Sequence, residues 1–79
     1  MAKTLFRVCE DEVVWAETAD ELVAYLARTS KVPVDKQGFR ERAAFWLEGL
    51  WGQKVRTDTD AEFIEDMLAI GRYEIVETH

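Results

Sequence analysis

The residues best suited to chemistry in this chain are few and lie far apart in sequence. Cys9 and His79 are its lone cysteine and lone histidine, whereas a zinc site needs about four ligands. We therefore expect Cys9 to serve as a small apolar residue. Ser30 has neither the glycine-rich elbow nor the nearby base that a nucleophilic serine requires. The glycines are scattered, so we expect no phosphate-binding loop. With these few reactive residues, we expect neither a metal nor a cofactor.

Acidic residues are the chain's largest store of reactive groups. The segment 58–62, Asp-Thr-Asp-Ala-Glu, resembles the start of a calcium-binding loop. The sixth position of such a loop should be glycine and is Phe63, and the twelfth should be glutamate and is Ala69. No carboxylate stands in an apolar stretch that would raise its pKa for general acid catalysis. We expect no calcium site and no enzyme activity.

The same acids suggest binding rather than catalysis. Glu62, Glu65 and Asp66 fall on one outward face of an expected helix, and Asp58 and Asp60 precede them. Such a face could meet a basic groove that normally holds nucleic acid, because complementary charge speeds association and selects the partner. The alternative is a solvated helix face that keeps a small protein soluble.

Phe45 and Arg42 form a second candidate contact on the preceding helix. Phe45 lies almost opposite the expected apolar stripe of that helix, in a row with two glycines and Arg42. Aromatic residues and arginine are enriched at binding hot spots. The alternative is a helix covered on two sides, which would bury Phe45. We expect Trp15, Trp46 and Trp51 to belong to the core.

Local signals predict the elements that position these residues. Capping boxes begin at Thr18 and Thr59, Asp35 is a further N-cap, and Gly52 and Gly71 end helices. The predicted helices span about 19–29, 36–51 and 60–70. Their apolar stripes are Ala19, Leu22, Val23 and Leu26; Phe39, Ala43, Trp46, Leu47 and Leu50; and Phe63, Ile64, Met67 and Leu68.

Alternating strand formers predict strands over 4–10, 13–17 and 73–78. The first two form a hairpin around a tight turn at Asp11-Glu12. This turn would place Phe6, Val8, Val13 and Trp15 on one face, and Leu5, Arg7, Cys9, Val14 and Ala16 on the other. Both faces are apolar, so the sequence does not decide which face belongs to the core. We predict an α+β fold in the order ββαααβ, with a three-stranded antiparallel sheet packed on helices.

Size and charge narrow the class of protein. With 79 residues, the chain should be one domain over 1–79, and 48% hydrophobic residues favour a globular fold. A net charge of −6 argues against direct nucleic-acid binding. No apolar run approaches a membrane span, and we see no signal peptide. A lone cysteine favours a reducing compartment, so we expect a cytoplasmic monomer.

These features together resemble the small anti-CRISPR proteins that bacteriophages and mobile elements carry. The shared features are small size, acidic charge, the ββαααβ order, the row Glu62, Glu65 and Asp66, and the lack of catalytic residues. The likeness is closest to inhibitors of type I systems, with subtype I-C as one candidate, and it covers the whole chain without a shared motif. It implies a bacterial host cell and a protein partner in an RNA-guided surveillance complex, where the inhibitor blocks target DNA binding or nuclease recruitment.

Other functions remain open at this point. An antitoxin-like or adaptor protein would bind another cytoplasmic protein through a mixed apolar and charged patch. A self-assembling structural protein of a phage or mobile element is a further alternative. In either inhibitor or regulator, the residues expected to contact the partner are Glu62, Glu65, Asp66, Asp58, Asp60, Phe45 and Arg42.

Overall fold

The computed structural model describes residues 3–8 and 11–78. The expectations for Cys9, Glu10 and His79 concern residues that lie outside the described ones. The elements are β1 (Thr4–Arg7), β2 (Val13–Ala16), α1 (Ala19–Thr29), α2 (Lys36–Trp51), α3 (Asp60–Ala69) and β3 (Glu74–Thr78). The predicted ββαααβ order is confirmed.

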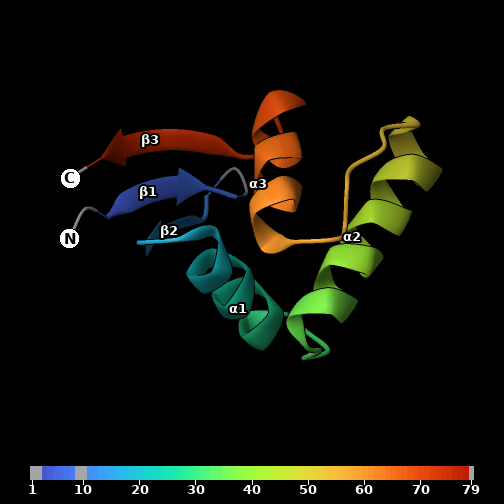
Figure 1. Ribbon diagram of the computed structural model, residues 1–79, viewed down its shortest axis with the longest axis horizontal. Coiled ribbons are helices and arrows are strands. Elements are labelled where there is room, and N and C mark those ends of the chain that lie inside the picture. The colour runs from blue at the N-terminus through green and yellow to red at the C-terminus, as the bar shows by residue number, and fades with distance from the viewer. Residues whose placement is uncertain (1–2, 9–10, 79) are drawn as a thin grey trace.

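The three strands form one antiparallel sheet in the order β2-β1-β3. The last strand thus returns to the N-terminal hairpin and pairs with β1, and a register shift lies between Leu5 and Phe6 on that side. Figure 1 shows the sheet at one end of the molecule, α2 at the other, and α1 and α3 between them. The helix that carries Phe45 is therefore the element farthest from the sheet.

The hairpin turn differs from the prediction. Arg7 pairs with Val13, and the Val8 N–H donates to the Glu12 carbonyl at 3.0 Å, so the connection is longer than a two-residue turn at Asp11-Glu12. Relative to the predicted hairpin, the pairing of β1 with β2 is displaced by an odd number of residues. Because side chains alternate with a period of two, this displacement changes which residues share a face.

The changed register decides which face of β2 is buried. Val14 and Ala16, not Val13 and Trp15, lie with Phe6 on the core side. The strand β2 packs against α1, and its buried side carries Val14 and the small Ala16 as members of the core. Val13 and Trp15 stay exposed on the outer face of the sheet.

Side-chain caps begin each helix where the sequence predicted. The hydroxyls of Thr18 and Thr59 each accept a backbone N–H three residues on, at 3.1 Å, and the Asp35 carboxylate accepts the Gly38 N–H at 2.7 Å. Gly52 ends α2 with φ 66°, in the left-handed region that glycine tolerates. The third helix ends one residue earlier than predicted, with Ile70 as its C-cap.

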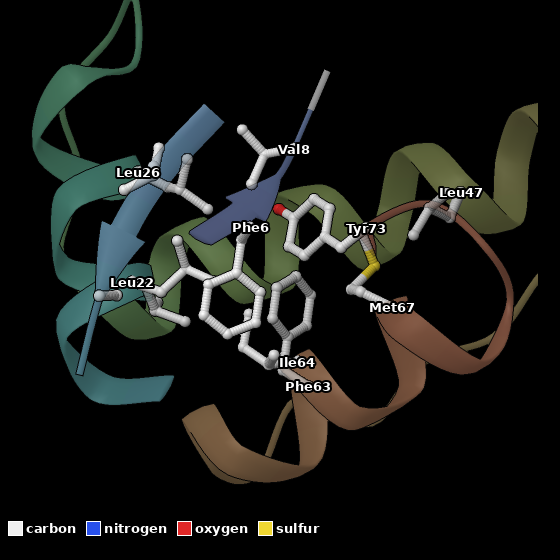
Figure 2. Close-up of a cluster of buried hydrophobic side chains, with 12 residues drawn as sticks. Phe6, Val8, Leu22, Leu26, Leu47, Phe63, Ile64, Met67 and Tyr73 are labelled. Carbon is white, nitrogen blue, oxygen red and sulfur yellow. The ribbon is translucent and has the colours of Figure 1, made fainter. Parts of the chain in front are cut away.

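The core lies between the sheet and the three helices. Figure 2 shows Phe6 of β1, Leu22 of α1 and Phe63 of α3 meeting in one cluster. Phe63 is fully buried and makes edge-to-face contacts with Phe39 and Tyr73, with ring centroids 6.1 and 6.4 Å apart. Most stripe residues of α1 and α3 are buried as predicted, while Leu68 is partly buried.

The stripe predicted for α2 is only partly buried. Leu47 is buried and Phe39 and Ala43 pack against the core, but Trp46 and Leu50 are exposed. The second helix lies against α1 and less extensively against α3. Only one side of it is covered, and the side of Trp46 and Leu50 faces solvent. The expectation that all three tryptophans belong to the core is wrong, because Trp51, like Trp15 and Trp46, is exposed.

Candidate protein-binding surfaces

The acidic face of α3 is occupied by an arginine from the preceding link. Arg56 reaches three carboxylates, at 3.1 Å to Glu62, 3.0 Å to Glu65 and 2.9 Å to Asp66. Its backbone N–H also donates to Asp66 at 2.8 Å. The four groups together carry a charge of about −2 rather than the −3 of a free acidic row. The structure brings the predicted residues together, but with a cation among them.

Arg56 changes the acid–base behaviour of this cluster. Its side-chain and backbone hydrogen bonds lower the pKa of Asp66, and Asp66 and Glu65 raise the pKa of Arg56. Asp66 is mostly covered, whereas the Glu65 side chain is 76% exposed. Glu65 is therefore the carboxylate of this row best placed to meet a partner. We call this group, Arg56, Glu62, Glu65 and Asp66, the α3 acidic cluster.

Asp60 is not a surface residue. Its side chain is only 6% exposed, accepts a hydrogen bond from the Arg40 guanidinium and lies 3.2 Å from Lys36. Lys36 also lies 3.4 Å from Asp20, and the hydrogen bond to Asp60 raises the pKa of Lys36. These contacts join the N-terminal turn of α1, the first turns of α2 and the start of α3. Asp60 has a structural role, and it is not available to a binding partner.

Asp58 borders a polar hollow at this junction. The hollow has a volume of about 420 Å³, and its lining includes Asp20, Asp35, Lys36, Arg40, Asp58 and Asp60. Its two cations are paired with carboxylates, as the contacts of Asp60 show. Within residues 3–8 and 11–78, no group of three or more potential ligands is arranged to hold a metal ion.

The exposed side of α2 carries large apolar side chains. Phe45 is 77% exposed, Trp46 56% and Leu50 58%, and Gly49 lies among them on the helix surface. A Cβ atom built on Gly49 would meet nothing within 4 Å, so this part of the surface is open. We call Phe45, Trp46, Gly49 and Leu50 the α2 apolar surface. The sequence prediction included Phe45 but placed Trp46 and Leu50 in the core.

No protein-family model, no curated protein and no solved structure matches this chain. Function is therefore inferred from the surfaces of the molecule. None of the helices in the described segments is long and apolar enough to cross a lipid bilayer.

The side chains around the α2 apolar surface are held in place by the fold. The Arg42 guanidinium donates to the Val32 carbonyl at 3.2 Å, which ties it to the loop before α2. On the other side of the helix, the Arg72 guanidinium stacks 3.9 Å from the ring of Trp51. Arg42 is thus close to Phe45 in sequence and on the helix, as predicted, but its charge is directed toward the loop.

Arg40, on the buried side of α2, is a sequence signal for which side of the helix faces the core. Arg40 lies on the helix face of Ala43 and Leu47, where a charge can be buried only with a partner. An acid had to lie opposite it, and Asp60 is that acid. Because an inward-facing arginine occupies this side of α2, fewer apolar residues of the helix turn inward. The position of Arg40 could therefore have indicated that the buried side of α2 is rotated away from the predicted apolar stripe.

Proposed function

We propose that this protein is a non-catalytic inhibitor that acts by binding another protein, with a type I CRISPR surveillance complex or its recruited nuclease as the target. The observation that carries the proposal is the α2 apolar surface. Contiguous apolar patches of a few hundred Å² on a protein surface are often binding sites. Phe45, Trp46 and Leu50 are the kinds of side chain that anchor protein interfaces.

The choice of target is supported by the whole-chain resemblance to anti-CRISPR proteins. Such an inhibitor works by occupation, because a small rigid domain seated on the complex blocks target DNA binding or nuclease recruitment without chemistry. A helix on the outer edge of the molecule, as α2 is, can enter a groove of the target while the rest of the domain stays outside.

The α3 acidic cluster provides a second contact for a target that binds nucleic acid. Its net charge of about −2 suits a surface rich in lysine. Because Glu62 and Asp66 bind Arg56, reversing their charge would disturb the link as well as the surface. Glu65→Gln is the cleaner test, since Glu65 is mostly exposed and removing its charge leaves the contacts of Arg56 to Asp66 in place.

The experiment is phage plaquing on bacterial strains with active type I CRISPR systems, with and without expression of the protein. We expect plaquing to be restored on at least one strain, and the effect to disappear when the CRISPR locus is deleted. Phe45→Ala should abolish the restoration at equal soluble expression. Val13→Ala is the matched control, because Val13 is an exposed apolar residue on the outer face of the sheet.

Each outcome has a defined consequence. Restored plaquing that depends on Phe45 and not on Val13 supports inhibition through α2. Restored plaquing that is unaffected by Phe45→Ala and lost in Glu65→Gln would move the contact to the α3 acidic cluster. No restoration on any type I strain, despite soluble expression, would overturn the CRISPR target.

A further inference from the structure

The α2 apolar surface has an acidic border on the side of Phe45. Glu41 lies four residues before Phe45 and Glu48 three residues after it, so both belong to neighbouring positions on the helix surface. Both are exposed. Among the described residues, Glu48 takes part in no ion pair, and Glu41 accepts a hydrogen bond only from the neutral amide of Gln37, at 3.2 Å.

Within the described part of the chain, no basic residue of α2 forms an ion pair with this border. Arg40 is buried against Asp60, and Lys36 bridges Asp60 and Asp20 at the other end of the helix. Arg42 donates to the Val32 carbonyl. Arg42 keeps its positive charge, but among the described residues no ion pair joins it to Glu41 or Glu48, so two exposed carboxylates beside Phe45 outnumber the one nearby cation.

Glu48 of this border and the ring of Phe45 lie beside a shallow hollow. Phe45, Glu48 and Gly49 line it, and its volume is about 290 Å³. The absence of a side chain at Gly49 leaves one wall low, since nothing lies within 4 Å of its missing Cβ. An aromatic face beside a carboxylate suits the side chain of lysine or arginine. The stem packs on the ring, the cation interacts with the π system, and its head pairs with the acid.

A second copy of this chain is a poor occupant of the same surface. Two copies carry a charge of −6 each, and a symmetric contact would bring both acidic borders together. The area is also small. Taking about 150–250 Å² for a fully exposed large side chain, Phe45, Trp46 and Leu50 expose roughly 400 Å². A stable interface uses about 800 Å² on each partner, so the occupant must also engage the border.

From this geometry we infer that the α2 surface binds a basic amphipathic segment of a partner protein. Apolar side chains of that segment cover Trp46 and Leu50, and a lysine or arginine lies along Phe45 with its cation at Glu48. The inference rests on the proposed protein-binding function and specifies the chemistry of the partner. It assigns recognition to Glu48 and Glu41, which pair with no cation of α2, rather than to the α3 acidic cluster, which already holds Arg56.

The test uses two synthetic helical peptides as probes, one of leucine and lysine and one with glutamate in place of every lysine. Both are titrated into the isotopically labelled protein at physiological ionic strength, and amide and indole shifts are followed by NMR. We expect only the lysine peptide to bind, with shifts centred on residues 41–51. Phe45→Ala should weaken binding at least tenfold and Glu48→Gln several-fold. The matched control Glu17→Gln, an exposed acid between β2 and α1, should leave binding unchanged.

Three results would overturn the inference. Equal binding of both peptides would show that charge does not select the partner. Equal weakening by Glu48→Gln and Glu17→Gln would show a general attraction to an acidic protein. Shifts centred on the α3 acidic cluster, or no binding at all, would remove α2 as the site for a basic segment. The plaquing assay stays independent, because inhibition that needs Phe45 but not Glu48 would keep the proposed function and reject this partner chemistry.

Discussion

Asp60 should be the carboxylate whose loss most damages the fold. It accepts a hydrogen bond from Arg40, whose side chain is only 10% exposed. The variant Asp60→Ala leaves Arg40 as a buried cation, with the Thr57 carbonyl at 2.9 Å as its remaining partner. Removing one member of a buried ion pair costs about 3–5 kcal/mol, mostly because the other charge stays buried.

That loss is large for this protein. At about 0.05–0.15 kcal/mol per residue, a chain of 79 residues has a free energy of unfolding of about 4–12 kcal/mol. For a domain of this size, each kcal/mol shifts the melting temperature by about 4–8 °C. The expected decrease for Asp60→Ala is therefore about 12 °C or more, and the variant should also unfold at a clearly lower urea concentration.

Urea and thermal unfolding followed by circular dichroism measure this effect. Glu65→Ala is the control, because it removes a mostly exposed carboxylate from the same helix and should change the midpoint little. The double variant Arg40→Met with Asp60→Leu should recover most of the loss, since it removes both buried charges and retains apolar volume. A wild-type midpoint for Asp60→Ala would refute the view that this pair joins α2 and α3.

Two further predictions concern the α3 acidic cluster and the end of α2. Because Arg56 lowers the pKa of Asp66, the stability that Asp66 contributes is complete above about pH 4 and is lost as pH falls through its lowered folded-state pKa. In an NMR titration of carboxyl carbons, Arg56→Met should raise the Asp66 pKa, and an unchanged value would contradict the contact. Thermal unfolding should show Gly49→Ala stabilising by about 0.5–1 kcal/mol and Gly52→Ala destabilising by about 1–2 kcal/mol. Both new Cβ atoms meet open space, but only Gly52 has a positive φ, so effects of the same sign would be inconsistent with this account.

The helix boundaries were predictable because their signals are local. Thr18, Asp35 and Thr59 bond to backbone groups three residues away, and Gly52 acts through its own φ angle. Nothing outside the helix is needed to place such ends. The hairpin register was not predictable in the same way, because both faces of β2 are apolar. Packing of β2 against α1 and the rest of the core decides between them, and that packing is not a property of the strand alone.

The candidate surfaces were only half predictable for a related reason. The exposure of Phe45 depends on whether another element packs against its side of α2. The periodicity of the helix does not contain that information. Arg56 contacts the α3 carboxylates from the irregular link between α2 and α3. In such a link, the spacing of residues does not predict where a side chain points. Burial of Asp60 was indicated only indirectly, by an arginine on the apolar side of α2.

The central position of β1 in the sheet has a consequence for how the protein opens. Its pairing with β3 joins residues at least 67 positions apart in sequence, which is the separation of Arg7 and Glu74. Closing so long a loop costs more chain entropy than closing the hairpin with β2. Every residue of β3 is exposed, so little burial offsets that cost. The last strand should therefore form late in folding and exchange its amide hydrogens first, and its departure would leave β1 with an open edge for other chains to pair with.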